Sequence, residues 1–359
     1  MVTPALQSFR QAIDAIDDKM LHLLQERGDL VQQIAKIKQQ AKGAFHVPER
    51  EAHLLRRLIA KNKGPYPDRA IEVIFREILS ASLALESTLK VAYLGPEGTF
   101  SHAAAAAKFG SSVLFLDRPS IRSIFEEVEA GRAHYGVVPV ENSTEGVINI
   151  TFDLFIVEFG LQISGELLLP IHHHLVAVTK DLKKIKKLYS HEQALAQCRQ
   201  WIEQKLPQVK VISAPSTAQA ALLAKKDKQA AAISSAFAAE KYKLKILHSN
   251  IEDVSQNFTR FWVIGQYAPQ PSGHDKTSIM FVAKDEVGIL AKVLQVFAEA
   301  NINLTKIESR PSRQEAWEYV FFIDLDGHRQ DSKVAAALEK MESLCHQLKI
   351  LGSYPKGNP

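Results

Sequence analysis

Cysteines and long apolar runs are scarce in this chain of 359 residues. The two cysteines, Cys198 and Cys345, are too few and too far apart to predict a disulfide scaffold or a thiolate metal site, so we expect both to be reduced. No run of about eighteen apolar residues predicts a membrane-spanning helix. The first residues also lack the basic segment and apolar stretch of a secretion signal. These absences predict a cytoplasmic protein.

An excess of one sign of charge is lacking as well, because 44 lysines and arginines stand against 40 aspartates and glutamates. Proteins that bind nucleic acid usually concentrate basic residues on one face. The densest basic run, residues 180–187, carries Leu182 and Ile185 at helical spacing, and we interpret it as the solvated face of a helix. We therefore expect neither nucleic acid nor a membrane as a partner.

The hydrophobic pattern divides the chain into three predicted domains, 1–88, 90–267 and 276–355, as its length alone would suggest. Apolar spacing predicts one very long helix from residue 3 to about 40, a second from 49 to 61 and a third from about 68 to 86. Short apolar strands then alternate with helices, which predicts α/β architecture with ligand groups at strand ends. After a linker rich in proline and glycine, the last segments follow the order βαββαβ, the ferredoxin-like pattern.

Cations on the first predicted helix are spaced for a small dianion. Arg27 and Lys38 are eleven residues apart, which leaves only about 20° between them and a rise of roughly 16 Å. Arg10 lies roughly 25 Å from Arg27 along the helix, so a shared pocket must take Arg10 from a second copy of the chain. The alternative is a set of surface cations whose stems cover apolar neighbours.

On the third helix, Ser82 and Glu86 continue an apolar row, and Glu49–Glu51 open the second helix with the letters ERE. Together with the cations, these residues make 5–88 similar to the all-helical class of chorismate mutases. The resemblance implies that the carboxylates of chorismate are held by Arg10 of the partner subunit, Arg27 and Arg50. It also implies that Lys38 and Glu86 contact the ether oxygen as the catalytic groups. The hydroxyl side of chorismate would be contacted by Glu51 and Ser82.

Two positions depart from the chorismate mutase pattern. Many relatives have glutamine where this chain has Glu86, and a carboxyl group donates to an ether oxygen only when it is protonated. We therefore predict mutase activity that favours lower pH. Val47 stands where some relatives have a polar residue, so one lesser contact is missing there.

In residues 91–266, small hydroxyl and amide side chains follow predicted strands, in GPEGTFS (95–101), ENS (141–143) and NFTRF (257–261). Singly, such residues are usually helix N-caps. With YSHEQ (189–193) and PST (215–217) they resemble prephenate dehydratases in order over about 175 residues. That family has a two-lobed α/β fold like periplasmic solute-binding proteins, which implies a second lobe at about 171–247.

The resemblance to prephenate dehydratases also implies site residues. Thr259 is expected to help the ring hydroxyl leave, through a hydrogen bond that strengthens in the transition state. The groups expected to hold carboxylates are Thr99, Ser143, Ser216, Thr217 and Arg260, and those expected to orient the ring are Asn142, Ser190, Gln193 and Gln197. We expect no cofactor and no metal, since His172, His173 and His174 alternate sides in a strand-like run.

The last segment resembles an amino-acid-binding ACT domain, a ferredoxin-like α+β module, in its phenylalanine-responsive form. The letters ESRP carry the resemblance, with a glycine at the start of the preceding helix. The effector contacts that it implies are Gly288, Leu290, Asn301, Glu308, Ser309, Arg310 and Pro311. Such domains pair side by side, which implies a homodimer or a dimer of dimers.

In this order, the three resemblances imply a bifunctional enzyme of phenylalanine biosynthesis. It would convert chorismate to prephenate, and prephenate to phenylpyruvate, CO2 and water, with feedback inhibition by L-phenylalanine. Two alternatives stay open. The chain could be a non-enzymatic sensor that regulates a partner, or a dehydratase whose helical domain is an inactive dimerisation arm.

Overall fold

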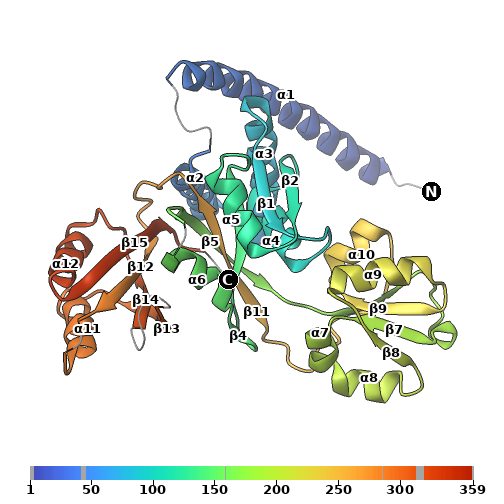
Figure 1. Ribbon diagram of the computed structural model, residues 1–359. Coiled ribbons are helices and arrows are strands. Elements are labelled where there is room, and N and C mark those ends of the chain that lie inside the picture. The colour runs from blue at the N-terminus through green and yellow to red at the C-terminus, as the bar shows by residue number, and fades with distance from the viewer. Residues whose placement is uncertain (1–3, 42–45, 158, 285, 313–318, 358–359) are drawn as a thin grey trace.

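The computed structural model describes residues 4–41, 46–157, 159–284, 286–312 and 319–357. Three helices come first, two β-sheets with their helices follow, and a last sheet with two helices ends the chain (Figure 1). Within the described ranges, no helix combines the length and the hydrophobicity that a membrane span needs.

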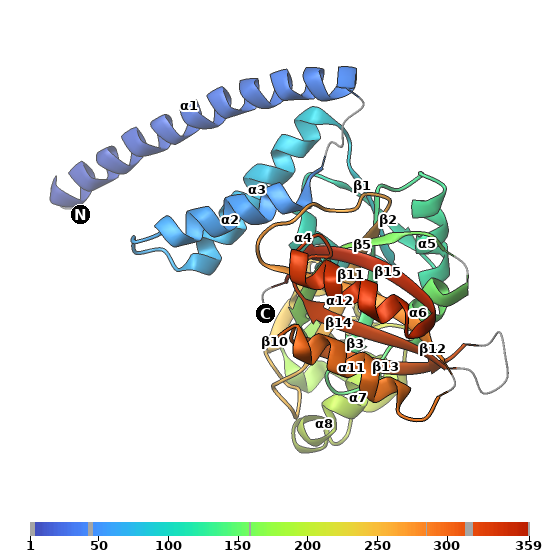
Figure 2. The same ribbon diagram turned by 90° about the vertical axis from the view of Figure 1, so that its left-hand side faces the viewer.

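The long first helix is confirmed as α1, Pro4–Ala41. The helices α2 (Pro48–Lys61) and α3 (Asp68–Glu86) follow, and α2 begins with proline at its first turn, where the missing N–H costs nothing. The C-terminal half of α1 lies over α3, whereas its N-terminal half projects away from the rest of the molecule (Figure 2).

The first lobe of the middle region has a six-stranded sheet of order β2-β1-β3-β11-β5, with β4 paired to β3. Its strands are β1 (Lys90–Leu94), β2 (Leu114–Arg118), β3 (Tyr135–Asn142), β4 (Gly146–Val147), β5 (Gln162–Pro170) and β11 (Phe258–Gly265). Its helices are α4 (Phe100–Phe109), α5 (Ile121–Glu129) and α6 (Asn149–Val157). The strand β11 returns to this sheet from far along the chain, between β3 and β5.

The second lobe is inserted between β5 and β11, so the two-lobed prediction is confirmed. Its five-stranded sheet has the order β10-β6-β9-β7-β8. The strands are β6 (His174–Ala177), β7 (Lys187–Ser190), β8 (Lys210–Ser213), β9 (Ala230–Ser234) and β10 (Lys245–His248). The helices are α7 (Glu192–Gln197), α8 (Arg199–Lys205), α9 (Thr217–Lys226) and α10 (Ala236–Tyr242).

The prediction of a helix face at residues 180–187 is wrong. Only one 3-10 turn, Leu182–Lys184, forms there, and β7 begins at Lys187. Ile185 is buried in the core of the second lobe, and β7 takes a central place between β8 and β9. The parallel pairing of β7 with both neighbours therefore overrides the local helical spacing.

The last region forms a four-stranded antiparallel sheet of order β13-β14-β12-β15, which confirms the ferredoxin-like prediction. Its elements are β12 (Asp275–Ala283), α11 (Ile289–Glu299), β13 (Leu304–Pro311), β14 (Tyr319–Asp326), α12 (Ser332–Glu342) and β15 (Cys345–Pro355). One face of the sheet packs against α11 and α12. The strand β13 lies at the edge, with one described neighbour.

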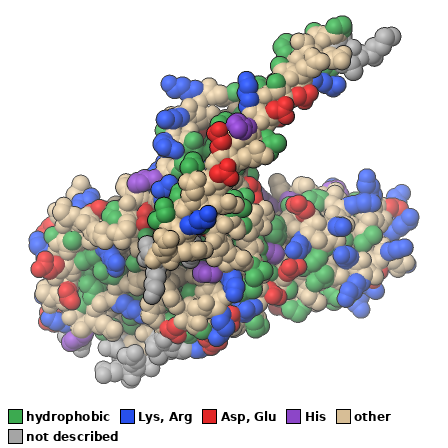
Figure 3. Space-filling model, turned by 90° about the horizontal axis from the view of Figure 1, so that it is seen from above, with side chains coloured by type: hydrophobic (Ala, Val, Ile, Leu, Met, Phe, Trp, Pro, Cys, Tyr) green, Lys and Arg blue, Asp and Glu red, His purple; other side chains and the backbone are tan. Residues whose placement is uncertain are grey.

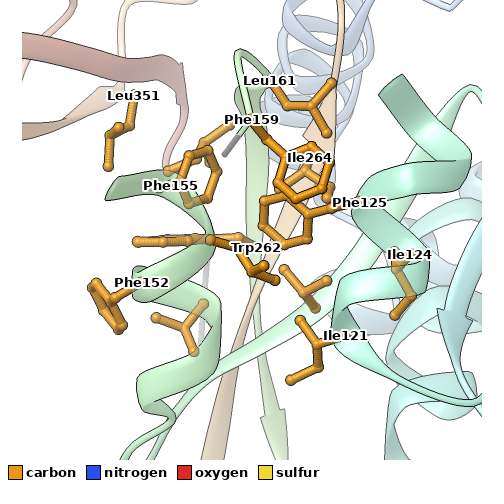
Figure 4. Packing of buried hydrophobic residues seen from close by; sticks show 14 of the residues in the cluster. Ile121, Ile124, Phe125, Phe152, Phe155, Phe159, Leu161, Trp262, Ile264 and Leu351 are labelled. Atoms are coloured by element: carbon orange, nitrogen blue, oxygen red, sulfur yellow. The ribbon is translucent and has the colours of Figure 1, made fainter. Parts of the chain in front are cut away.

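The other face of this last sheet packs on the first lobe and shares its core. Trp262 on β11, Phe152 and Phe155 on α6, and Leu351 on β15 belong to one buried cluster (Figure 4). Trp262 is only 1% exposed and meets both phenylalanine rings edge-on. Because burying such aromatic side chains contributes much of a core's stability, we treat the first lobe and the last region as one packed unit.

Candidate functional sites

The three N-terminal helices enclose a cavity of about 920 Å³. Six residues predicted to contact chorismate lie in its wall: Arg27, Lys38, Arg50, Glu51, Ser82 and Glu86. Val47 lines it as well, at the position where some relatives have a polar residue. The remaining wall includes Val31, Ile34, Phe75 and Leu79, so charged groups face a partly apolar space.

Positive charge gathers in this cavity. Burial, followed by repulsion from the Arg50 guanidinium, lowers the pKa of Arg27. Arg27 donates a hydrogen bond to the Ser82 hydroxyl, which donates to the carbonyl of Ile78 at 2.6 Å. Lys38 Nζ lies 2.7 Å from Glu86 Oε2, in an ion pair. Like charges held together in a cavity favour an anionic ligand, because the ligand relieves their repulsion.

The Glu51 carboxylate, which lines the cavity, is already paired with protein groups. Its oxygens lie 3.2 Å from His46 Nε2 and 3.3 Å from Arg76 Nη1. Burial alone would raise the pKa of Glu51, but the hydrogen bond from His46 and nearby cations lower it overall. Arg76 also donates to the carbonyl of Lys108 at 2.9 Å, so Glu51 is connected to the end of α4 in the first lobe.

Sequence reasoning missed three polar residues of this cavity, His46, His53 and Arg57. His53 and Arg57 follow Arg50 by three and seven residues, which places them on the same face of α2. That spacing was visible in the sequence. His46 precedes α2, and no local signal predicts its contact with Glu51.

Arg10 is exposed on the projecting half of α1, far from the cavity of its own chain. Large apolar side chains are exposed on the same helix: Leu6, Phe9, Ile13, Ile16, Met20, Leu21, Leu23, Leu24, Leu30, Ile34 and Ile37. Hydrophobic side chains are visible on this arm in Figure 3. A contiguous exposed apolar stripe of this kind is typical of an interface.

In the first lobe, the structure brings Asn142, Ser143 and Thr259 together. Asn142 and Thr259 are direct partners in the pairing of β3 with β11, and Asn142 Nδ2 lies 2.8 Å from Thr259 Oγ1. The Ser143 hydroxyl accepts from the backbone N–H of Phe258 at 2.9 Å. Thr99 lies apart from this group as the N-cap of α4 and donates to the carbonyl of Leu94.

In the second lobe, Ser190, Ser216 and Thr217 lie at one edge of the sheet. Ser190 ends β7 and donates to the carbonyl of Ile233 at 2.8 Å. Ser216 is the N-cap of α9, directly before Thr217, after the neighbouring parallel strand β8. Gln193 is exposed in the first turn of α7.

Gln197 bridges the two lobes. From the end of α7 its Nε2 donates to Glu145 Oε1 at 3.1 Å and to Thr144 Oγ1 at 3.2 Å in the first lobe. The lobes also meet where the Tyr242 hydroxyl donates to the carbonyl of Glu97. Of the residues predicted for prephenate in the second lobe, Gln197 therefore reaches the turn that follows Asn142 in the first.

Arg260 is not brought together with the other residues predicted for prephenate. Consecutive residues of a strand face opposite sides, so Arg260 lies on the face of β11 opposite Thr259. Its nitrogens lie 2.7 Å from Glu166 Oε2 and 3.2 Å from the Tyr354 hydroxyl, and it pairs with Asp324. Burial alone would lower the pKa of Arg260, but these three neighbours raise it.

The acidic partners of Arg260 connect the first lobe to the last region. Burial alone would raise the pKa of Glu166, but Arg260 and Lys276 together hold it below its ordinary value. Lys276 Nζ lies 2.8 Å from Glu166, and Ser278 donates to Asp324. Because Glu166 belongs to β5 while Lys276 and Asp324 belong to the last sheet, this network is part of the interface between them.

The residues predicted to bind an effector fall into two groups. Gly288 and Leu290 begin α11, and the ESRP residues end β13 at the same end of the domain. Asn301 lies beyond the opposite end of α11, eleven residues after Leu290 or roughly 16 Å away. Gly288 and Asn301 both have positive φ, 79° and 51°.

Alternate residues of β13 face the first lobe. Arg310 lies 3.0 Å from Asp153 and donates to Asn149, while Lys306 Nζ lies 2.8 Å from Glu141 on β3. Glu308 lies between them in this row, whereas Ser309 and Pro311 belong to the exposed alternate row. ESRP is therefore split between an inner and an outer face.

Comparison with known proteins assigns all three regions. Family profiles described as chorismate mutase type II, prephenate dehydratase and ACT domain match residues 9–87, 91–269 and 277–343. A bifunctional chorismate mutase/prephenate dehydratase of Aquifex aeolicus is 49% identical over 98% of both chains, and one of Pseudomonas aeruginosa is 45% identical over the same shares. The solved prephenate dehydratase of Arthrobacter aurescens, in complex with L-Phe, is 34% identical with a TM-score of 0.68, covering 74% of this chain and 90% of its own. The chain thus belongs to the family of bifunctional chorismate mutase/prephenate dehydratases.

Proposed function

We propose that this chain rearranges chorismate to prephenate in the cavity of its helical domain and converts prephenate to phenylpyruvate between the two lobes of its middle domain. The observation that carries the first step is the group of cations around one cavity, Arg27, Lys38 and Arg50. The second step rests on the meeting of Asn142, Ser143 and Thr259 where the lobes join.

The first reaction is a Claisen rearrangement, which needs no nucleophile. The protein has to hold the dicarboxylate in a compact conformer and to place positive charge where the breaking C–O bond leaves negative charge. Arg27 and Arg50 are assigned to the carboxylates, Lys38 and Glu86 to the ether oxygen, and Ser82 to the hydroxyl side. Glu51 is paired with His46 and Arg76, so we assign it to supporting the site and not to contacting the substrate.

The second reaction removes CO2 and the ring hydroxyl from prephenate. The pair of electrons of the C–CO2 bond enters the ring, the C–O pair departs with the oxygen, and one proton from solvent completes the water molecule. Thr259 is assigned a hydrogen bond to the departing oxygen, which strengthens as negative charge develops there. Arg260 is left out of this site, because its guanidinium contacts Glu166, Asp324 and Tyr354.

A homodimer completes the mutase site in this proposal. The apolar stripe of α1 is the surface that a second copy covers, and it carries Arg10 toward the partner's cavity. The open edge of β13 offers a second contact. If two such edges pair antiparallel about a twofold axis, Asn301 of one copy lies beside the ESRP end of the other.

L-Phenylalanine is the proposed effector and feedback inhibitor, at the interface between paired ACT domains. Two observations support this: a relative with a similar fold was solved in complex with L-Phe, and Lys306 on β13 pairs with Glu141, the residue before Asn142. Inhibition would be reciprocal, so that prephenate weakens phenylalanine binding by the same factor.

The test supplies the purified protein with chorismate and follows both its loss and the appearance of phenylpyruvate, with and without phenylalanine. We expect phenylpyruvate to form and phenylalanine to suppress it. If prephenate accumulates instead, the chain has the mutase activity but not the dehydratase activity. If chorismate is not consumed, the helical domain is an arm without activity, and prephenate is then supplied directly to test the second step.

A further inference from the structure

We propose that Asn257 and His173 are positioning residues of the dehydratase reaction, because they hold the side chains of Asn142 and Gln197 in place beside the Thr259 hydroxyl. The inference rests on the proposed function, in which Thr259 contacts the departing oxygen of prephenate. Asn257 and His173 are each 3% exposed and lie beside the group formed by Asn142 and Thr259.

The orientation of the Asn142 amide is determined by backbone donors. Its Oδ1 accepts from the backbone N–H groups of Thr144 at 3.0 Å and of Glu145 at 3.1 Å. A backbone N–H can only donate, so the amide cannot be flipped, and Nδ2 must face Thr259 Oγ1 at 2.8 Å.

This orientation determines what Thr259 can do. An NH2 group has no acceptor, so Thr259 Oγ1 must accept from Asn142, and its own hydrogen points elsewhere. Among the residues that the structure describes, no acceptor lies within hydrogen-bond distance of the Thr259 hydroxyl hydrogen. The hydrogen is therefore left for a ligand.

Asn257 continues the chain of hydrogen bonds that begins at Asn142. Asn142 Nδ2 also donates to Asn257 Oδ1 at 2.8 Å, so Asn257 Nδ2 faces Gln197 Oε1 at 3.2 Å. The Nε2 of Gln197 donates to Glu145 and Thr144, and the Thr144 hydroxyl donates back to Asn142 Oδ1 at 2.6 Å. The side chains of Asn142, Asn257, Gln197 and Thr144 thus form a closed ring, in which each donor meets an acceptor.

His173 holds the Gln197 amide in this ring. Its Nε2 lies 2.8 Å from Gln197 Oε1, which can only accept, so the hydrogen of the imidazole is on Nε2. Its Nδ1 is buried with no partner among the described residues. Burial lowers the pKa of His173, which keeps its imidazole neutral, with the hydrogen on Nε2. Without this donor, Gln197 Oε1 keeps only the N–H of Asn257, and the contact that joins Asn257 to the second lobe is weakened.

The ring also joins the two lobes. Gln197 belongs to the second lobe, while Asn142, Thr144 and Thr259 belong to the first. The Asn142 amide, which directs the Thr259 hydroxyl, is therefore held in place by contacts that also join the lobes.

The first test replaces Asn257 with a side chain of the same shape. In Asn257→Asp an ionised carboxylate faces Gln197 Oε1. Both groups can only accept a hydrogen bond, so this contact becomes repulsive. We expect the dehydratase kcat at pH 8 to fall by about tenfold to 100-fold with little change in KM, since a misdirected group costs rate more than binding. As pH falls and the new carboxyl is protonated, it donates to Gln197, and kcat recovers. The charged or titratable groups that face this position are Glu145, Glu252, His172 and His173.

The second test is a matched pair at His173. His173→Gln retains an N–H near the position of Nε2, whereas His173→Leu removes it. We expect the glutamine variant to keep most of the dehydratase kcat and the leucine variant to lose it, again with little change in KM. The controls Asn250→Asp and His248→Gln make the same chemical changes outside the ring and should leave kcat unchanged.

A thermal melt reports folding of the two lobes in every variant, and mutase activity reports folding of the helical domain. A wild-type chain that makes no phenylpyruvate from prephenate would refute the proposed function. If the wild type is active and Asn257→Asp has the same kcat and the same pH profile, the positioning role of the ring is refuted. If Asn257→Asp lowers the melting temperature or the mutase activity, the His173 pair decides, and equal kcat values for its two members would overturn the inference.

Discussion

Arg260 offers a substitution that separates binding of substrate from stability of the fold. In Arg260→Met the side chain keeps a similar length but loses its charge and its hydrogen bonds to Glu166, Asp324 and Tyr354. The two acidic partners are 1% and 3% exposed, so each is left in a buried site with less compensation.

The loss of folding stability depends on the contacts that Glu166 and Asp324 keep in the variant. Removal of one partner of a buried ion pair costs about 3–5 kcal/mol. Lys276 still lies 2.8 Å from Glu166, and Ser278 still donates to Asp324, so we expect the lower end, about 3 kcal/mol. For a packed unit of about 150–250 residues this corresponds to a fall of roughly 6–12 °C in the melting temperature.

The assay combines a thermal melt with dehydratase kinetics. We expect the melting temperature to fall while KM for prephenate in the folded enzyme stays within about twofold, because Arg260 faces away from Thr259. Adding Asp324→Asn to Arg260→Met should restore part of the loss, since a buried unpaired charge is then removed. A variant with an unchanged melting temperature and a KM raised tenfold or more would refute this reasoning and return Arg260 to the substrate.

Three further predictions concern the mutase site, assembly and pH. Glu86→Gln should raise the mutase kcat/KM by about tenfold, because an amide can donate to the ether oxygen whereas a carboxylate paired with Lys38 at 2.7 Å only accepts; an unchanged kcat/KM would remove the idea. Mixing Arg10→Ala with Lys38→Ala chains, each inactive as a mutase, should restore roughly a quarter of wild-type activity, because half of the dimers then carry one intact site; no recovery after subunit exchange would contradict a shared site. Since the pKa of Glu166 is lowered in the folded protein, its stabilising contribution is complete above its ordinary value of 4.5 and is lost as pH falls below it, so urea midpoints of wild type should fall more steeply there than those of Glu166→Gln.

Much of the architecture could be predicted from local pattern. The apolar spacing from residue 3 to about 40 predicted one helix, because no proline interrupts it after the first turn, and α1 confirms it. The order of strands and helices after residue 275 identified the ferredoxin-like domain. The prediction for residues 180–187 was wrong, because two apolar residues three apart in a basic run do not distinguish a helix from a turn that leads into a strand.

Candidate site residues were predictable where one element carries them. Arg27, Lys38, Ser82 and Glu86 reach one cavity because helical spacing places each of them on the inner face of α1 or α3. His46 was missed, since it precedes α2 and its contact with Glu51, five residues later, depends on a loop conformation that no repeat in the sequence shows. Asn257 and His173 were likewise passed over, because their contacts join segments that are far apart in the chain.

Local pattern was enough to predict most helices and strands, the order of the three domains and the family to which they belong. It also indicated that Thr259 and Arg260 face opposite sides of a strand, since side chains alternate there. Which of those sides meets Asn142, and which meets Glu166 and the last sheet, follows from the packing of strands that are distant in sequence. The direction of the Thr259 hydroxyl depends on both levels: the N–H groups of Thr144 and Glu145 that orient the Asn142 amide are local, but Asn142 reaches Thr259 only when β3 pairs with β11.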